Sequence, residues 1–320
     1  MHQEHQDRGQ GARQVGVATL SGALGTARTY EGAAGAAGAA GAAGAADSPV
    51  DAPDDSMEPE EARCLVVRWT GAESERRPDA LALEEPLELR LAGHPLTVTM
   101  RTPGHDEELA AGLLHAQDLL RHPSELERME RDPEQPNRLD ISLSTRLAGA
   151  ERWRRYTYVS SSCGICGVES LDALVVQSPP VMSGLRARAA TLYRLPDLLR
   201  EAQAGFGVTG GAHAAALFDP AGGLLVARED VGRHNAVDKV IGHALLNGRL
   251  PLDDMLLMVS GRISYEIVQK ALVARLPLIA AVSAPTSLAV RIADDRGITI
   301  VGFLRGERLN VYSHPARVIE

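Results

Sequence analysis

Residues 255–282 read MLLMVSGRISYEIVQKALVARLPLIAAV and give the clearest indication of the fold. Met255–Val259 and Leu278–Val282 are short apolar runs, which are typical of strands buried on both faces. Ser264–Arg275, between them, has apolar residues at the spacing of a helix. Strands that alternate with helices predict a three-layer α/β domain.

The same alternation continues on both sides of this segment. Upstream, Ala212–Phe218 and Gly223–Ala227 predict a pair of strands. Asn235–Leu246 then predicts a helix, because its apolar residues fall on one face. Downstream, Thr286–Asp295 predicts a helix and Ile298–Phe303 predicts a strand. We therefore expect one α/β domain in the second half of the chain.

The first half has a different pattern, in which strands dominate. One helix is expected after Thr102-Pro103-Gly104, where leucines recur near helical spacing. The fold class is therefore α/β, or α+β overall, with a smaller N-terminal β-rich subdomain beside the α/β core. Alternating apolar residues predict strands at Cys64–Trp69, Leu87–Leu91, Leu96–Met100, Leu139–Leu143 and Tyr156–Val159.

Three regions follow from these patterns. Residues 1–60 are expected to be a disordered low-complexity tail. Five Gly-Ala-Ala repeats and an acidic, proline-rich run offer too few large apolar groups to offset the entropy of ordering. Residues 61–180 are predicted to form the N-terminal subdomain, which ends in a loop with two cysteines. Residues 181–320 are predicted to form the α/β domain.

The composition argues against several classes of protein. A formal net charge of −9 does not suit a protein that coats nucleic acid. No apolar run approaches the ~20 residues of a membrane helix, so no membrane partner is expected. Three cysteines do not make a disulfide framework, and no secretory signal pattern is visible. A reducing, cytoplasmic setting is the simplest interpretation.

Two of the cysteines, Cys163 and Cys166, lie in the run SSSCGICG at 160–167. A structural zinc site needs four ligands, and one such pair supplies two. A zinc deaminase would combine His-x-Glu with Pro-Cys-x-x-Cys. Here His213 is followed by two alanines, and Ser162 precedes Cys163. We therefore predict no metal site.

Thiol chemistry explains the pair better than metal binding does. Two thiols at this spacing can lower the pKa of one of them, and each can resolve the other. A loop rich in glycine and serine suits a thiol that other proteins must reach, as a persulfide carrier requires. A thiol-disulfide oxidoreductase stays an alternative, as does a pair of small packing residues. Cys64, beside Leu65 and Val66, is interpreted as a packing residue.

Six motifs follow one another between residues 160 and 315. They are SSSCGICGVES, TGGAHAAALFD, REDVGRHNAVDKVIG, SGRISYEIVQKAL, AVSAPTSLAV and VGFLRGERLNVYSHP. Together they resemble the formate dehydrogenase accessory sulfurtransferases, the FdhD family, and the resemblance runs from about residue 60 to the C-terminus. The resemblance implies a protein that takes sulfur from a cysteine desulfurase as a persulfide. The sulfur would pass to a molybdenum (or tungsten) bis-molybdopterin guanine dinucleotide cofactor before that cofactor enters formate dehydrogenase.

The resemblance also implies roles for individual residues. Cys163 maps to the family's persulfide carrier, and Cys166 would assist or resolve. Family members are homodimers with a cytidine-deaminase-like core, so both features are expected of this chain. A cofactor-binding chaperone without sulfur transfer stays an alternative. Cofactor binding maps to Leu304, Arg305, Gly306, Glu307, Arg308 and Leu309.

The residues themselves favour a shared ligand edge. Phosphates bind backbone N–H groups, helix N-termini and arginines, and ligands gather beyond the carboxyl ends of strands. We place Ser260, Arg262 and Tyr265 near the ligand. His213, between alanines on a predicted strand, could face the ligand or be a satisfied core histidine, and the family resemblance favours the first. Turns of this kind adjoin successive predicted strands at Thr209-Gly210-Gly211, Ser260-Gly261-Arg262, Ser283-Ala284-Pro285-Thr286 and Arg305-Gly306.

Residues 230–238, DVGRHNAVD, are dense in polar groups at the start of a predicted helix. His234 and Asp238 are four residues apart and could form an acid-base pair. The alternative is a network at the helix N-terminus, with Asp230 or Asn235 as the cap. We prefer the network for Asp238 and leave His234 open. Another pair at this spacing, Glu266 and Lys270, is interpreted as a surface ion pair.

Overall fold

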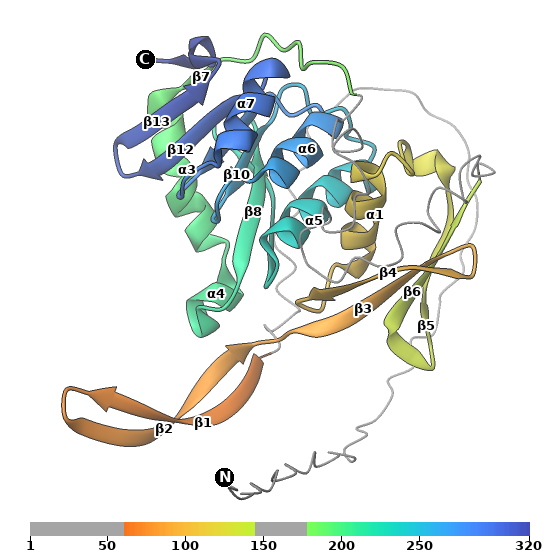
Figure 1. The fold of residues 1–320 in the computed structure, drawn as a ribbon, viewed down its shortest axis with the longest axis vertical. Coiled ribbons are helices and arrows are strands. Elements are labelled where there is room, and N and C mark those ends of the chain that lie inside the picture. The colour runs from red at the N-terminus through yellow and green to blue at the C-terminus, as the bar shows by residue number, and fades with distance from the viewer. Residues whose placement is uncertain (1–60, 145–177) are drawn as a thin grey trace, which may run out of the picture. The chain divides into compact units, whose positions relative to one another are not determined.

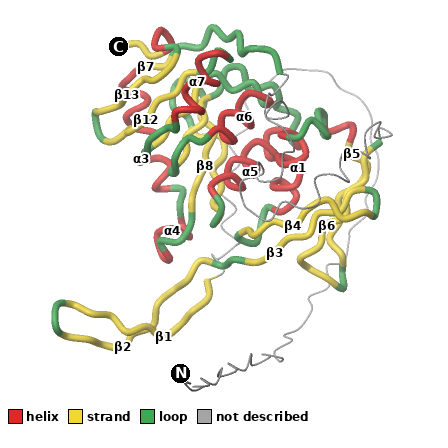
Figure 2. Tube along the Cα trace, viewed as in Figure 1, coloured by secondary structure: helices red, strands yellow, loops and turns green. Residues whose placement is uncertain are grey.

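The computed structural model describes residues 61–144 and 178–320 (Figures 1 and 2). Three predictions lie outside the described residues: the tail at 1–60, the strand at Tyr156–Val159 and the cysteine run at 160–167. The boundary expected near residue 180 stays a prediction.

A six-stranded sheet lies at the centre of the α/β part, in the order β13-β12-β11-β10-β8-β9. Strands β10, β11 and β12 run parallel, while β8, β9 and β13 are each antiparallel to a neighbour. The strands predicted for this half of the chain are therefore confirmed. Their bounds are β8 His213–Phe218, β9 Leu224–Asp230, β10 Leu256–Val259, β11 Leu278–Ala281, β12 Thr299–Arg305 and β13 Arg308–Ser313.

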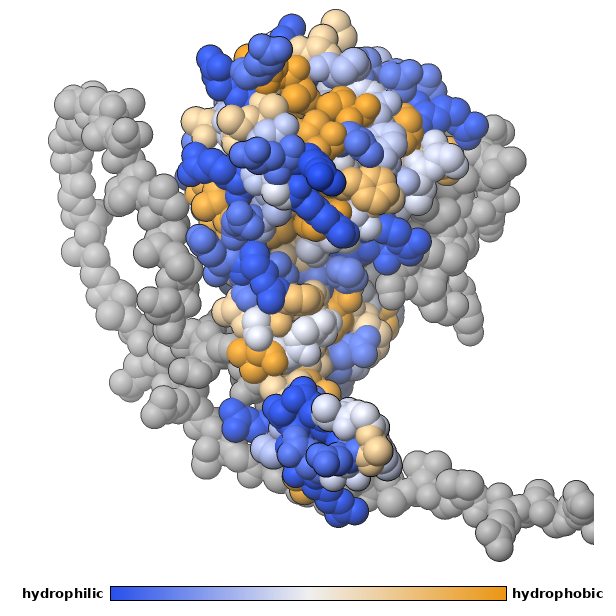
Figure 3. Space-filling view, turned by 90° about the vertical axis from the view of Figure 1, so that its left-hand side faces the viewer, coloured by the Kyte–Doolittle hydropathy of each residue, from blue (hydrophilic) through white to orange (hydrophobic). Residues whose placement is uncertain are grey.

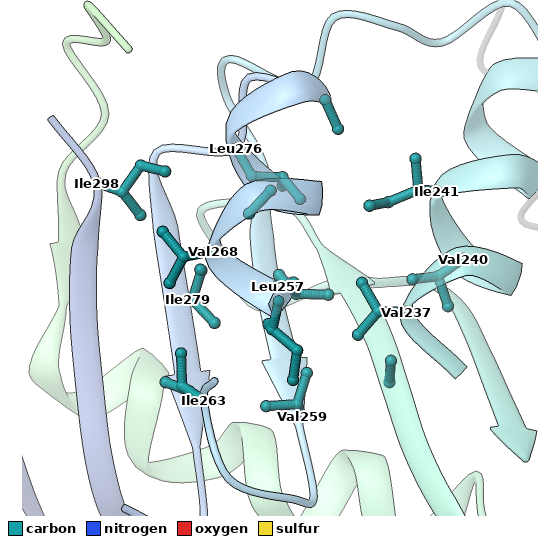
Figure 4. Packing of buried hydrophobic residues seen from close by; sticks show 14 of the residues in the cluster. Val237, Val240, Ile241, Leu257, Val259, Ile263, Val268, Leu276, Ile279 and Ile298 are labelled. Atoms are coloured by element: carbon teal, nitrogen blue, oxygen red, sulfur yellow. The ribbon is translucent and has the colours of Figure 1, made fainter. Parts of the chain in front are cut away.

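Helices cover both faces of this sheet (Figure 1). Successive strand side chains point to opposite faces. Leu257 and Ile279 therefore pack with α5, α6 and α7 (Figure 4), whereas Met258 and Ala280 pack with α3. The predicted three-layer α/β architecture is confirmed. The helices are α3 Ala189–Glu201, α4 Ala204–Thr209, α5 Arg233–Leu246, α6 Tyr265–Val273 and α7 Ser287–Asp295.

The N-terminal part is β-rich, as predicted. A four-stranded sheet in the order β4-β3-β6-β5 shares a buried leucine-rich cluster with helix α1. Strands β1 Glu61–Thr70 and β2 Glu73–Ala82 form a separate antiparallel hairpin. The remaining bounds here are β3 Glu85–Leu91, β4 His94–Arg101, α1 Asp106–Ala116, η1 Pro123–Glu125, β5 Leu126–Asp132 and β6 Gln135–Leu143.

Short elements complete the described part of the chain. The C-terminal strand β14 pairs in parallel with β7, which precedes α3. This pairing joins the last residues of the chain to the start of the α/β part. The elements are β7 Ala187–Arg188, η3 Pro315–Arg317 and β14 Val318–Ile319.

Helices α1 and α5 cross at two glycines. A Cβ atom added at Gly112 would lie 2.6 Å from the carbonyl carbon of Asp238, and one at Gly242 would lie 2.7 Å from that of Glu108. Both obstacles are backbone atoms, which cannot swing aside as a long side chain can. The two glycines therefore set how closely the N-terminal helix approaches the α/β part.

A buried polar network fixes the same contact. The Asp230 carboxylate accepts hydrogen bonds from the backbone N–H of Thr102 at 3.2 Å and of Gly232 at 2.8 Å. Lys239 Nζ lies 2.8 Å from Asp230 and donates to the carbonyl of Thr102 at 2.9 Å. Asn235 donates to the carbonyl of Met100 at 2.8 Å. The start of α5 is thereby tied to the loop between β4 and α1.

A second polar cluster holds α1 against β9 and α5. Arg228 Nε and Nη2 donate to the two carboxylate oxygens of Glu108 at 2.6 and 2.8 Å. His243 Nδ1 lies 2.9 Å from the same carboxylate. Burial would raise the pKa of Glu108, but the hydrogen bonds from Arg228 and His243 outweigh it and lower this pKa to about 2. Glu108 therefore stays ionised well into acid.

The surface of the described residues mixes polar and apolar groups, as the face drawn in Figure 3 shows. Several large apolar side chains are exposed, among them Trp69, Val208, Phe303 and Tyr312. In this part of the chain, no helix combines the length and the apolar character that a membrane crossing requires.

Candidate functional site at one edge of the sheet

The strand directions bring the predicted turns to one edge of the sheet. The carboxyl ends of β9 to β12 meet the amino ends of the antiparallel strands β8 and β13 there. Register pairs His213 with Asp230 and Arg305 with Arg308. The N–H of Ser260 donates to the carbonyl of Ala214 at 2.9 Å, which joins the end of β10 to β8. The predicted turns therefore do share one edge, of the kind where open α/β sheets bind ligands, and the binding of a ligand there stays a prediction.

The segment Leu304–Leu309 comprises the end of β12, the tight turn Gly306-Glu307 and the start of β13. Arg305, Gly306, Glu307 and Arg308 are exposed on this turn. Gly306 has a φ of +51°, in the left-handed region that favours glycine. Leu304 is completely buried in the cluster that includes α3, so its side chain holds the turn in place. The groups on this turn that can reach a ligand are the two arginines, Glu307 and backbone atoms.

Phe303 is a feature of this edge that the sequence analysis missed. It lies in an irregular stretch of β12, with a φ of +52° and a side chain that is 45% exposed. A bulky residue in the left-handed region costs about 1–3 kcal/mol, and such strain gathers at functional sites. The sequence does distinguish this position, because the chain has three phenylalanines and Phe303 is the one that follows a glycine at the end of a predicted strand.

His213 and Arg233 converge over Gly261 at the end of β10. A Cβ atom at Gly261 would lie 3.3 Å from Arg233 Cδ and 3.5 Å from His213 Nδ1. Burial lowers the pKa of His213, and the Arg233 guanidinium lowers it further, against the attraction of Asp230. His213 is therefore a neutral imidazole near pH 7. Arg233 Nε is buried and has no hydrogen-bond partner among the described residues.

The predicted site residues of the β10–α6 turn differ in their surroundings. The Ser260 hydroxyl accepts a hydrogen bond from the N–H of Ala214 at 2.9 Å, so it helps to join two strands. Arg262 is exposed. Tyr265 is 6% exposed, and burial raises the pKa of its phenol. Arg262 is thus the member of this group that is most accessible to a ligand.

His234 and Asp238 do not form the acid-base pair considered for them. Asp238 accepts from Lys270 Nζ at 2.8 and 2.9 Å. His234 instead lies between Ser264, 3.0 Å from its Nε2, and Glu266, 3.3 Å from its Nδ1. A polar network is present at the start of α5, where the Asp230 carboxylate accepts from the N–H of Gly232 and from the Asn235 side chain. The expected cap is wrong, because Gly232 holds the cap position and no side chain caps the helix, and Asp238 pairs with Lys270 of α6 instead.

The interpretation of Glu266 and Lys270 as a surface pair was wrong. Their charged groups are 3.5 Å apart, but the two residues are 8% and 5% exposed, because α6 turns this side toward α5. Burial raises the pKa of Asp238 to about 6, against the attraction of Lys270. Burial lowers the pKa of Lys270, but Asp238 and Glu266 outweigh it and hold this pKa above its ordinary value. Lys270 is therefore a buried cation between two carboxyl groups.

Cys163 and Cys166 lie outside the described residues, so their predicted roles stay predictions. Cys64 is partly exposed on β1, where its register partner is Asp79. Among residues 61–144 and 178–320, no three histidines, cysteines or acidic residues are grouped as metal ligands would be.

The chain matches known proteins over most of its length. The FdhD/NarQ family model matches residues 82–319. Sulfur carrier protein FdhD of Mycolicibacterium paratuberculosis is 45% identical over 267 residues, covering 80% of this chain and 98% of that protein. The protein of the same name from Mycobacterium tuberculosis is 48% identical over 255 residues, covering 76% and 92%. That from Saccharolobus solfataricus is 40% identical over 256 residues, covering 79% and 96%.

A solved structure shows the same fold. It is a crystal structure of a candidate formate dehydrogenase accessory protein from Desulfotalea psychrophila. The two chains are 24% identical and superpose with a TM-score of 0.66 over 81% of this chain and 99% of the other. At this level of identity the likeness shows the mixed α/β fold.

Proposed function

The chain belongs to the FdhD/NarQ family, and from this we propose that it is a sulfurtransferase that carries sulfur as a cysteine persulfide. The observation that carries the proposal is the match to proteins named sulfur carrier protein FdhD over nearly their whole length. The cysteine pair at 163 and 166 provides the required thiols. Cys163 is the proposed carrier, and Cys166 assists it.

The proposed loading step is a thiol exchange between persulfides. The Cys163 thiolate attacks the outer sulfur of a persulfide on a cysteine desulfurase. A bond forms between Cys163 Sγ and that sulfur, and the bond to the donor breaks. The donor leaves as a thiolate, and Cys163 holds the persulfide. No oxidant or reductant is consumed in this exchange.

The proposed acceptor is the molybdenum (or tungsten) bis-molybdopterin guanine dinucleotide cofactor, bound as cargo. What supports this acceptor is the chemistry of the sheet edge. Arg262, Arg305 and Arg308 are exposed there and suit pyrophosphate oxygens. Phe303 offers an aromatic face to a planar base. The neutral imidazole of His213 adds a donor or acceptor that carries no competing charge.

The proposed partners follow from the same argument. The donor is a cysteine desulfurase, and the protein served is a formate dehydrogenase, which agrees with the accessory role ascribed to the structural relative from Desulfotalea psychrophila. We further propose a homodimer with a cytidine-deaminase-like core, as the family resemblance implies. A cytoplasmic setting suits the proposal, because a persulfide needs reduced thiols.

Replacement of Cys163 tests the function in cells. Cys163→Ala should abolish formate dehydrogenase activity in a host whose own accessory protein has been deleted, while the purified variant keeps the wild-type melting temperature. Cys64→Ala is the matched control, because Cys64 lies on a strand far from the motif in sequence. Full activity of the Cys163→Ala variant would contradict the carrier role and favour a cofactor-binding chaperone.

A further inference from the structure

Three polar side chains form a chain of contacts at the start of α6. The hydroxyl of Ser264 lies 3.0 Å from Nε2 of His234. Nδ1 of the same imidazole lies 3.3 Å from Oε2 of Glu266. Hydroxyl, imidazole and carboxylate in this order are the parts of a general-base site, which is recognised by geometry and not by sequence position.

Ser264 occupies the cap position of α6 without acting as a cap. A serine there usually accepts a hydrogen bond from an N–H of the first helical turn. The Ser264 side chain makes no such bond. Thr286, in the same position at α7, does accept from the N–H of Ala289, at 3.4 Å. The Ser264 hydroxyl is thus directed to His234 at the expense of the helix cap.

The carboxylate of Glu266, the last member of this chain of contacts, is held in place by Lys270. Oε1 of Glu266 lies 3.5 Å from Nζ of Lys270, which is bound in turn to Asp238. Oε2 is buried and accepts no hydrogen bond among the described residues, and His234 Nδ1 lies 3.3 Å from it, at ion-pair distance. The negative charge of Glu266 therefore favours a proton on Nδ1, which leaves Nε2 to accept the proton of Ser264.

Ser264 lies at the ligand edge, beside groups that attract anions. It follows Ser260-Gly261-Arg262, the turn that leaves the carboxyl end of β10. Arg262 is exposed two residues away, and Ser264 itself is partly exposed. The first turn of α6 directs N–H groups toward the same edge, which favours negative charge. The surroundings therefore suit a phosphate ester better than a neutral substrate.

We propose that Ser264 is a nucleophilic serine, with His234 as its general base and Glu266 as the residue that positions the base, and that it reacts with a phosphate ester. In the step, a bond forms between Ser264 Oγ and phosphorus, and the bond to the leaving oxygen breaks. The serine proton passes to His234 Nε2 and then to the leaving group. Water then gives a proton to His234 Nε2 and bonds to phosphorus, the bond from phosphorus to Ser264 Oγ breaks, the serine takes the proton back from His234, and the phosphate leaves. The cysteine pair takes no part.

An alkyl fluorophosphonate tests this reactivity directly, because it places electrophilic phosphorus at a serine and expels fluoride. The measurement is the rate of labelling at each serine of the full-length protein, from peptide mass spectra. Ser260 is the internal control, since it lies on the same turn but its hydroxyl bonds to a backbone N–H. We expect Ser264 to react about 100-fold faster than Ser260, as a general base supplies about 10²–10⁴-fold.

Variants separate the roles of the three residues. Ser264→Ala removes the label, and His234→Gln lowers its rate about 100-fold. Glu266→Gln lowers the rate about tenfold in the folded protein, because the amide favours the wrong imidazole tautomer. Equal labelling of Ser264 and Ser260 in the wild type would overturn the proposal without any variant. So would full labelling in a folded His234→Gln protein. Neither result depends on sulfur transfer by Cys163.

Discussion

The crossing of α1 and α5 gives a prediction that follows from two distances. In Gly242→Ala, the new methyl would lie 2.7 Å from the carbonyl carbon of Glu108 and 2.8 Å from the N atom of Gly112. The carbonyl oxygen of Glu108 would lie closer still, and ordinary contact needs 3.4 Å or more, so the two backbones must separate by at least about 1 Å at this point. The rest of the helix contact opens with them, because both helices are rigid over this length.

The expected loss of stability can be estimated from the gap. A gap of about 0.5–1 Å forfeits a quarter to a half of the dispersion energy of the atoms that face it, and a buried leucine makes roughly 40–60 such contacts of about 0.1–0.2 kcal/mol. Loss around one or two such side chains amounts to about 4 kcal/mol. Alanine recovers about 1 kcal/mol through its helix propensity. The free energy of unfolding should therefore fall by about 3 kcal/mol.

Chemical denaturation followed by circular dichroism measures this change. The matched control is Gly207→Ala, because Gly207 is also helical but an added Cβ would meet nothing within 4 Å. The control should be unchanged or slightly more stable. If Gly242→Ala were as stable as the control, the close backbone contact between α1 and α5 would be refuted.

Three further outcomes follow from buried charge and exposed aromatic surface. Lys270→Met leaves the Asp238 carboxyl without its cation and should cost about 3–5 kcal/mol in denaturation, much of which Asp238→Leu in the same chain restores. The pKa of Glu108 is lowered from 4.5 to about 2, so the ionised carboxylate adds its full share to the free energy of unfolding above pH 4.5, and this share is lost as the pH falls toward 2. After allowance for partial exposure, the share is about 2 kcal/mol. In Glu108→Gln, the free energy of unfolding should therefore fall less between pH 4.5 and pH 2 than it does in the wild type. Phe303→Ala should weaken guanosine diphosphate binding about tenfold in a fluorescence titration, with the melting temperature little changed.

The sequence predicted the α/β part well because its strands are buried on both faces. Leu256–Val259 and Leu278–Ala281 are uninterrupted apolar runs, and each is bounded by a turn. The glycine and serine turns lie directly after or before these strands in the sequence. Their position at one edge of the sheet could therefore be predicted from the strands alone, without the positions of side chains. Such local signals fix an element without reference to its neighbours.

The elements that were missed depend on their partners. Strand β2, ESERRPDALA, is charged and contains Pro78, so nothing local marks it as a strand until it pairs with β1. Helix α3 contains Pro196, and proline lowers the helix propensity of the residues around it, so the local sequence does not predict a helix there. The burial of Lys270 could not be predicted from the sequence either, because it depends on the approach of α5 to α6 and not on the four-residue spacing from Glu266. The left-handed backbone of Phe303 is likewise set by an irregularity in the pairing of β12 with β13.

The role of Cys163 is tested most directly by the intact mass of the purified protein after incubation with a cysteine desulfurase and cysteine. We expect a gain of one sulfur, ~32 Da, which a reducing agent removes. The gain should be present in Cys64→Ala and absent from Cys163→Ala. No gain in the wild type, or a gain that survives in Cys163→Ala, would contradict the claim that Cys163 carries the sulfur.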